Sequence, residues 1–290
     1  MNVSYREASD VDLAKACIPR RSTSRKGENG VVLVVGGSWL YHGAPFLVSM
    51  AAMRSGVDLV YVAVPEKIAT AVRSLSPSLI VLPLPDYKLT SKSLDRLEKV
   101  LDNVTAAAIG PGLAKGCEKG ILKLVDILDE KNVGIVLDAT ALFRDVLLHV
   151  AGRKCVLTPH AGEFKRLYGS EPGSTLEERV NNVFEASKHH RVVTLLKGPA
   201  DVVSDGFEVV VNRKEPLSAA MTVGGTGDVL TGIAAGFVAK GVTPMNAAVA
   251  AAVANGLAGV YAAHKKGFHI TPEDVIEEIP AVLKRFDSVV

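Results

Sequence analysis

Residues 222–237 read TVGGTGDVLTGIAAGF and place Asp228 directly after a glycine-rich run, at the start of a predicted helix. Glycines let backbone N–H groups approach an anion closely, and the first turn of a helix adds unpaired N–H groups and the positive end of its dipole. The loop is therefore suited to holding phosphoryl oxygens. An aspartate beside a transferring phosphoryl group can act as the general base that accepts a hydroxyl proton. The alternative is an ordinary helix N-cap after a flexible loop, and the spacing alone does not choose between them.

Two more charged side chains follow predicted strands. In LLKGPADVV, Lys197 could bind a nucleotide phosphate or ribose, or it could be a solvated lysine at a strand end. In VGIVLDATAL, Asp138 could face a metal ion or simply cap the next turn.

The segment TPHAGEF offers a third set of polar groups. Thr158 is a candidate helix N-cap, with Pro159 in the first helical turn. His160 and Glu163 lie three residues apart and would share one helix face. There they could hold a substrate and a water on a magnesium ion, or they could merely begin a surface helix.

Neither common nucleotide-binding fingerprint is present. A Walker A motif needs G-K-[ST] after its spacer, and this triplet does not occur. The loop GGSWLYHG after the first long apolar run lacks G-x-G-x-x-G. Both folds that carry these motifs are therefore disfavoured.

The elements that must position these loops are short Val/Ile/Leu runs alternating with helical patterns. Helices are expected at 44–55, about 228–240 and about 244–264. Strands are predicted at 31–35, 58–65, 78–85, 105–110, 133–138, 154–158 and 191–198, and a hairpin within 201–211 that turns at Asp205-Gly206. Such a series indicates an α/β fold, with a mostly parallel central sheet between two helical layers. We expect a single domain over residues 1–290, with ligands beyond the carboxyl ends of the strands.

Composition sets outer limits on function. The chain has 290 residues, 48% of them hydrophobic, and a net charge of +2, so no basic field indicates nucleic acid. Cys17, Cys117 and Cys155 are too few and too scattered for a disulfide framework, which favours a reducing compartment. The N-terminus has no apolar core typical of a signal peptide. The uncharged stretch 245–263 is rich in alanine and interrupted by Asn and Gly, so we expect a buried helix and not a membrane span.

Taken in order, TPHAGEF, KGPAD and GGTGDVLTG resemble the ADP/ATP-dependent NAD(P)H-hydrate dehydratases. The segment KGENGVVLVVGGSWLYHGAPFLVSMAAMRSGVDLVYVAVPE matches that family's opening almost throughout, and the resemblance spans roughly residues 20–280. Related sugar and vitamin kinases carry glycine loops like GGTGDVLTG, so the combination with TPHAGE and GGS…HGA is the specific signal. The resemblance implies a ribokinase-like fold, a three-layer α/β/α arrangement.

The resemblance also implies a repair reaction. Reduced nicotinamide cofactors become hydrated at a ring double bond, and members of this family remove the water from the S form of the hydrate with a nucleotide. The hydroxyl is phosphorylated and phosphate is then eliminated, because phosphate is a far better leaving group than hydroxide.

Several residues match the family's substrate positions. Ala44 in YHGAP and Gly112 in GPGL match positions that line the hydrate pocket, where small residues let a flat ring lie against the backbone. His160 matches a histidine that contacts the substrate. Asp228 matches the acid that contacts the substrate, and we expect it to be the catalytic base.

Other residues match the nucleotide and metal positions. Gly227 matches a position at the nucleotide phosphates, and Glu163 sits where the wider superfamily keeps an acid for magnesium. The loop that matches the ADP- or AMP-binding segment comprises Lys197, Gly198, Pro199, Ala200 and Asp201.

The sequence departs from the family pattern in two places. Residues 218–223 read SAAMTV where Gly-Asn followed by Ala-Thr-Gly is more common, which weakens any nucleotide contact expected there. Thr140 stands where a second acid is common, so no carboxylate role is expected at that position. Neither change affects Gly225, Gly227 or Asp228.

The cofactors implied are Mg²⁺ and ADP or ATP, with NAD(P)H hydrate as substrate; the choice of nucleotide and of NADH or NADPH hydrate stays open. A separate NAD(P)H-hydrate epimerase is expected as functional partner, since this chain begins too late to include one. We also expect a cytoplasmic homo-oligomer, a tetramer, with no nucleic-acid or membrane partner. Its alanine-rich helix faces could pack between subunits or within one.

Two other functions compete with the dehydratase. The first is a kinase of the same fold that phosphorylates a sugar or a vitamin precursor and releases a stable ester, against which TPHAGE and the hydrate-pocket loops argue. The second is a regulatory nucleotide-binding module without turnover, against which the presence of Asp228 and Glu163 argues.

Overall fold

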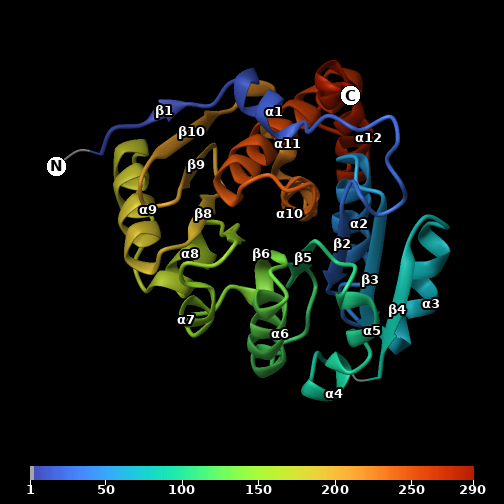
Figure 1. The fold of residues 1–290 in the computed structure, drawn as a ribbon. Coiled ribbons are helices and arrows are strands. Elements are labelled where there is room, and N and C mark those ends of the chain that lie inside the picture. The colour runs from blue at the N-terminus through green and yellow to red at the C-terminus, as the bar shows by residue number, and fades with distance from the viewer. Residues whose placement is uncertain (1–2, 86) are drawn as a thin grey trace.

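Runs of Val, Leu, Ile and Ala form the strands at the centre of the protein (Figure 1). The computed structural model describes residues 3–85 and 87–290. The strands of that part of the chain are β1 (Arg6–Glu7), β2 (Val31–Val35), β3 (Leu59–Pro65), β4 (Ile80–Leu84), β5 (Ala106–Ile109), β6 (Gly134–Leu137), β7 (Cys155–Leu157), β8 (Val193–Leu196), β9 (Ala200–Ser204) and β10 (Val209–Arg213).

These strands make one sheet in the order β1-β10-β9-β8-β7-β6-β5-β2-β3-β4. Every pair from β8 to β4 is parallel, whereas β9 runs antiparallel to both β8 and β10. The mostly parallel sheet and the hairpin predicted from the sequence are therefore confirmed. The two-residue strand β1, which pairs with β10, was not predicted, because so short a run carries no periodicity.

The strand order reverses between β2 and β5. The chain passes from β2 outward through β3 to β4, then returns to β5 on the other side of β2 and continues to β8. In an open α/β sheet such a switch point leaves a crevice beyond the carboxyl ends of the strands, where ligands bind. The loops after β2 and β5 meet at this point, and Gly37 N–H donates to the carbonyl of Pro111 at 2.9 Å.

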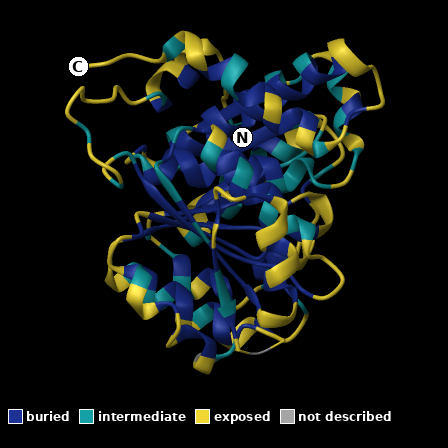
Figure 2. Cartoon of the chain, turned by 90° about the vertical axis from the view of Figure 1, so that its right-hand side faces the viewer, coloured by how far each residue is buried: buried dark blue, intermediate teal, exposed yellow. Residues whose placement is uncertain are grey.

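Helices cover both faces of the sheet, which is consequently buried (Figure 2). Along β2, Val32 and Val34 pack into one cluster with α2 and α10, and the alternate residues pack into the cluster around α6. The helices are α1 (Asp10–Ala16), α2 (Gly43–Arg54), α3 (Glu66–Leu75), α4 (Ser91–Leu94), α5 (Glu98–Leu101), α6 (Glu118–Glu130), α7 (Val146–Val150), α8 (Ala161–Tyr168), α9 (Leu176–His190), α10 (Thr226–Ala239), α11 (Pro244–Lys266) and α12 (Pro272–Leu283). The 3-10 turns are η1 (Ala139–Ala141), η2 (Pro216–Thr222) and η3 (Lys284–Phe286).

Helices α2 and α10 lie in close contact because glycines remove side chains between them. A Cβ at Gly232 would overlap the carbonyl oxygen of Val48 and lie 2.7 Å from the Cβ of Ala51. One turn later, a Cβ at Gly236 would lie 2.8 Å from the Cβ of Ser55. The two helices thus run in the same direction, and both begin at the carboxyl edge of the sheet.

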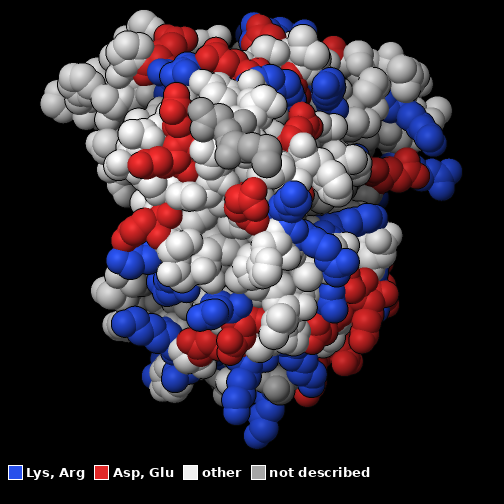
Figure 3. All heavy atoms as spheres, turned by 90° about the vertical axis from the view of Figure 1, so that its left-hand side faces the viewer, with Lys and Arg blue, Asp and Glu red and all other residues white. Residues whose placement is uncertain are grey.

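Helix α11 is long and apolar enough by composition to cross a membrane, but 83% of its most apolar window is buried within the fold. Its alanines pack against α12, α10 and α1 and against the inner face of the sheet. The helix is therefore part of the protein core, as predicted. On the face shown in Figure 3, basic and acidic side chains intermingle, in keeping with the nearly balanced charge.

Candidate active site

Asp228 lies in the first turn of α10, which begins two residues earlier than predicted. The N-cap is Gly225, whose φ of +101° suits glycine. A Cβ on Gly225 would also lie 2.8 Å from the Leu47 side chain and 2.9 Å from Pro272. The alternative in which Asp228 is the N-cap is therefore wrong, because Asp228 is the third residue of the helix.

A buried ion pair lies beside Asp228. Asp138 directly follows β6 and is 3% exposed, and Lys197 directly follows β8. The Lys197 ammonium donates to Asp138 Oδ1 at 2.7 Å, and Thr231 Oγ1 on α10 donates to Asp138 Oδ2 at 2.9 Å. Lys197 is thus largely buried and paired, not a solvated strand-end lysine, and the Asp138 carboxylate holds the lysine and helix α10.

The surrounding charges set the protonation of Asp228. The pKa of the Asp228 carboxyl is raised to about 7, chiefly by burial and also by the negative charges of Asp138 and Glu163, against the opposing positive charge of Lys197. Burial acts to lower the pKa of Lys197, but the attraction of Asp138 and Glu163 outweighs it and raises that pKa. Lys197 therefore stays charged while Asp228 can exchange a proton near neutral pH, as a general base requires.

Helix α8 begins differently from the prediction. Its N-cap is His160, whose Nδ1 accepts from the N–H groups of Gly162 at 3.0 Å and Glu163 at 3.3 Å. Thr158 is not the cap, because its hydroxyl is buried and donates to the Leu137 carbonyl. Pro159 accordingly precedes the helix instead of lying in its first turn.

The same cap fixes His160 and Glu163. Because Nδ1 accepts two hydrogen bonds, the neutral His160 ring carries its proton on Nε2, and the ring is 59% exposed. Glu163 Oε2 accepts from the N–H of His160 at 2.9 Å and lies 3.7 Å from the Lys197 ammonium. His160 Nε2 lies 3.5 Å from Glu163 Oε1, so the glutamate carboxylate faces both the histidine ring and the Lys197 ammonium.

Ala44 and Gly112 meet at the switch point. A Cβ at Gly112, whose φ is +72°, would lie 3.1 Å from the Cβ of Ala44 and 2.7 Å from the Tyr41 carbonyl. On the same loop, a Cβ at Gly110 would overlap the Asp138 carbonyl. The loop that carries Gly110 and Gly112 thus packs closely against both Ala44 and the backbone of Asp138.

Lys197 also lines a cavity of about 630 Å³. The predicted nucleotide residues Lys197, Gly198, Pro199, Asp201 and Gly227 all line it, together with His160 and η2. Ala200 does not line it and pairs in the hairpin, while Ala44, Gly112 and Asp228 lie outside its lining.

Asp201 lines this cavity and holds the loop around Gly198 by hydrogen bonds. It is 1% exposed, accepts from the Gly198 N–H at 3.0 Å, and accepts from the Lys214 ammonium at 2.8 Å. Lys214 also donates to the Gly198 carbonyl at 2.9 Å. The sequence did not point to Lys214, because its contact with Asp201 depends on the hairpin register that pairs Asp201 with Asn212. Thr231 was also missed, although its position three residues after Asp228 places both on one helix face.

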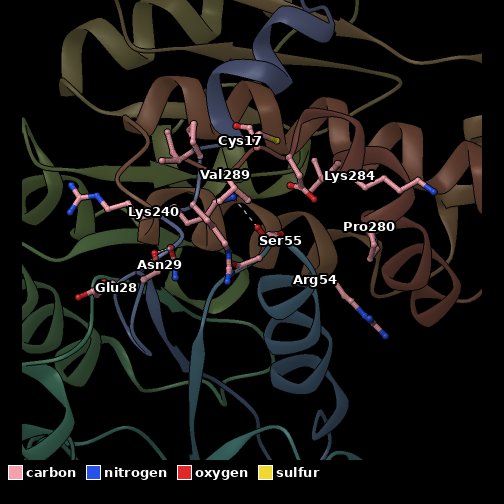
Figure 4. A pocket seen from close by; sticks show the side chains of 18 residues that line it. Cys17, Glu28, Asn29, Arg54, Ser55, Lys240, Pro280, Lys284 and Val289 are labelled. Carbon is pink, nitrogen blue, oxygen red and sulfur yellow. Dashed lines mark hydrogen bonds between the residues drawn. The ribbon is translucent and has the colours of Figure 1, made fainter.

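A larger cavity of about 1000 Å³ lies at the opposite edge of the sheet, where α2 and α10 end (Figure 4). Its partly buried lysine, Lys240, donates to the Ser55 carbonyl at 3.0 Å and so satisfies the end of α2. Arg54 and Lys284 extend away from Ser55 in Figure 4. Because none of the predicted site residues lines it, this cavity does not belong to the candidate active site.

Comparisons with known proteins give the family of the chain. The sequence profile of the NAD(P)H-hydrate dehydratase family matches residues 32–281. The chain belongs to this family. The ADP-dependent (S)-NAD(P)H-hydrate dehydratase of Cenarchaeum symbiosum (strain A) is 49% identical over 286 residues, which cover 98% of this chain and 99% of that protein.

Other members of the NAD(P)H-hydrate dehydratase family resemble part or all of the chain. The bifunctional NAD(P)H-hydrate repair enzyme Nnr of Pyrobaculum aerophilum is 45% identical over 278 residues, which cover 95% of this chain and 54% of that enzyme. The ADP/ATP-dependent NAD(P)H-hydrate dehydratase of Bacillus subtilis, co-crystallised with ATP/Mg²⁺, superposes with a TM-score of 0.80 at 26% identity, covering 99% of this chain and 100% of that one.

A ribokinase-like superfamily protein from Enterococcus faecalis also has a TM-score of 0.80, at 22% identity, covering 99% of each chain. The ribokinase-like fold expected from the sequence is therefore confirmed.

The fit of a magnesium ion can be judged from the carboxylates. Among residues 3–85 and 87–290, no group of three or more His, Cys, Asp or Glu side chains is arranged to hold a metal. Asp138 is already held by Lys197 and Thr231, and Glu163 by the His160 N–H. Magnesium is commonly held by one or two carboxylates together with substrate phosphates. Glu163 as a metal ligand stays a prediction, and it would need the nucleotide's phosphates to complete the site.

Proposed function

We propose that this protein removes water from the S form of NAD(P)H hydrate, with ADP as phosphoryl donor, and so restores NAD(P)H. The observation that carries the proposal is the position of Asp228, in the first turn of α10 beside the charges of Asp138, Lys197 and Glu163. Lys197 and Gly227 of the same region line the cavity. A base there would take the proton of the substrate hydroxyl close to a phosphoryl group bound in that cavity. The 49% identity to an ADP-dependent enzyme supports the choice of donor.

The chemistry proceeds in two steps. As the Asp228 carboxylate takes the hydroxyl proton, the hydrate oxygen attacks the terminal phosphorus of ADP, whose bond to the bridging oxygen breaks and releases AMP. The electron pair of the ring nitrogen then expels phosphate from the ring carbon. Loss of a proton from the neighbouring carbon re-forms the double bond of the reduced nicotinamide.

The chain's own residues orient these steps. Lys197, held by Asp138, keeps a positive charge at the boundary of the nucleotide cavity, where it favours phosphoryl oxygens. His160 would hydrogen-bond the substrate through its Nε2–H, which lies 3.5 Å from Glu163 Oε1 in this structure. The N–H groups at the start of α10 would bind the phosphates beside Lys197, which a Cβ at Gly227 would approach to 3.4 Å.

Several wider features belong to the same proposal. Mg²⁺ would be held by the nucleotide phosphates with Glu163, and would neutralise charge on them. A separate epimerase would supply the S form of the hydrate. We further propose a cytoplasmic location, which free Cys17, Cys117 and Cys155 support, and a tetrameric assembly.

The test is to mix the purified protein with hydrated NADH and Mg²⁺, and to follow the return of reduced-nicotinamide absorbance with ADP or with ATP. We expect recovery with ADP and release of free phosphate. Replacing the base in Asp228→Asn should preserve the fold and lower the rate by about 10² to 10⁴. Asp95→Asn, an exposed aspartate after α4, is the matched control and should retain full activity.

Near wild-type turnover of Asp228→Asn would contradict the assignment of the base. Consumption of nucleotide with a panel of alcohols, a stable phosphate ester as product and no recovery of NADH would instead support a small-molecule kinase.

A further inference from the structure

Three consecutive large apolar side chains are exposed on the loop between β2 and α2. Trp39 is 79% exposed, Leu40 71% and Tyr41 59%. Large apolar groups clustered on a surface commonly mark a binding site. These three lie at the switch point of the sheet, where a ligand crevice is expected.

The loop presents these side chains from a fixed base. Gly37 N–H donates to Pro111, and Ser38 N–H donates to the Tyr41 carbonyl at 3.4 Å, while Ser38 Oγ accepts from the Tyr41 N–H at 3.3 Å. This closed turn places Trp39 and Leu40 at its tip. At its end, the Tyr41 carbonyl and Cβ lie over Gly112, next to Ala44.

We propose that Trp39, supported by Tyr41, is a stacking platform for the adenine ring of the dinucleotide substrate. The inference rests on the proposed function, because it takes NAD(P)H hydrate as the ligand. If the reacting ring lies on Ala44 and Gly112 facing Asp228, the adenosine half must extend away from the reaction centre. The cavity beyond Lys197 belongs to the phosphoryl donor, so the exposed aromatic loop is the surface left for the second ring of the substrate.

Stacking of a base on an aromatic side chain provides affinity without base-specific hydrogen bonds. The platform therefore explains how one protein could bind the remote half of its substrate before chemistry begins. Binding energy from such a remote group appears mainly in KM when it is equal in the ground state and the transition state.

Steady-state kinetics tests the proposal. In Trp39→Ala, KM for NADH hydrate should rise about tenfold or more, while kcat and KM for ADP stay within about twofold. Trp39→Phe should recover much of the loss. Phe207→Ala is the matched control, because Phe207 is 93% exposed on the hairpin turn, near residues that precede β7 and β8 at the opposite edge.

A truncated substrate identifies the ring. Hydrated reduced nicotinamide mononucleotide lacks the adenosine half, so its KM should be high in the wild type and unchanged by Trp39→Ala. An equal rise in KM for both substrates would overturn the adenine assignment. Unchanged KM for NADH hydrate in an active Trp39→Ala variant would overturn the platform while leaving the proposed function intact.

Fluorescence gives a second readout, because Trp39 is the single tryptophan of the chain. With the donor site saturated by ADP, titration with ADP-ribose should quench its emission, and ADP alone should not. An emission that changes only with protein concentration would assign the loop to contact between copies of this chain, and would overturn the proposal.

Discussion

At the scale of single residues, the central group is a carboxylate whose neighbours oppose its charge. Asp228 is partly buried and lies near Asp138 and Glu163, so its pKa is raised to about 7. The positive charge of the nearby Lys197 favours its ionised form. The balance leaves a group that is a base above neutrality and an acid below it.

A pH profile should report this ionisation. Because the deprotonated form of Asp228 is the active one, kcat/KM should rise with pH through about 7 and then level off. Lys197 lowers the pKa of Asp228, so Lys197→Met should move this acidic limb to higher pH, whatever its effect on the maximal rate. The quantity to measure is the pH at the midpoint of the rise in kcat/KM, not the maximal value of kcat/KM.

Lys188→Met is the matched control, since Lys188 lies on α9 beside the hairpin turn, away from the charge cluster. Its profile should coincide with that of the wild type. A limb that stays in place in Lys197→Met would show that another group controls the profile.

At the scale of elements, the site depends on two helices that begin together. Ala44 is in the first turn of α2 and Asp228 in the first turn of α10, and close packing at Gly232 fixes their relative position. A Cβ at Gly232 would overlap the Val48 carbonyl, which belongs to backbone and cannot move aside easily. The substrate surface and the base are therefore aligned by a contact one turn or more behind them.

This packing predicts the effect of one added methyl group. Gly232→Ala should lower the free energy of unfolding by about 1–3 kcal/mol, because overpacking outweighs the gain in helix propensity. Thermal or denaturant unfolding measures it. Gly256→Ala on α11 is the control, since its new Cβ would meet only ordinary contacts at 3.6 Å and beyond. That change should be neutral or stabilising by up to about 1 kcal/mol, and equal losses in both variants would contradict the packing explanation.

The elements themselves were largely predictable from the sequence. A continuous apolar run such as 31–35 has side chains to bury on both faces of the strand, which a parallel sheet covered by helices allows. The contacts between individual side chains were not predictable from the sequence. Lys197 and Asp138 are 59 residues apart, and they meet only because β6, β7 and β8 are neighbours in the sheet. Thr158 failed as a predicted N-cap because the Leu137 carbonyl on the adjacent strand already accepts its hydroxyl.

At the scale of the whole molecule, the two ends of the parallel strands differ in the residues that gather there. The predicted site residues gather beyond the carboxyl ends of the strands, and the larger cavity lies at the other edge. Each cavity has a largely buried lysine, Lys214 at the first and Lys240 at the second. Size alone would favour the second cavity for the nucleotide, whereas the chemistry of the lining favours the first.

Ligand-induced stabilisation can decide between the two edges. ADP at a hundredfold excess over Kd should stabilise the wild type by about 2.7 kcal/mol, which raises Tm by several degrees. Lys214→Met should lose most of this shift, because Lys214 holds Asp201 and the Gly198 carbonyl in the loop that lines the cavity. Lys240→Met should keep this shift in Tm, although both variants start from a lower Tm.

Lys214→Met leaves the Asp201 charge buried and unpaired, so this variant alone could fail to fold. The double variant Lys214→Met with Asp201→Asn removes that charge and serves in its place. Loss of the shift in Lys240→Met alone would place the nucleotide at the opposite edge and refute the assignment of the site.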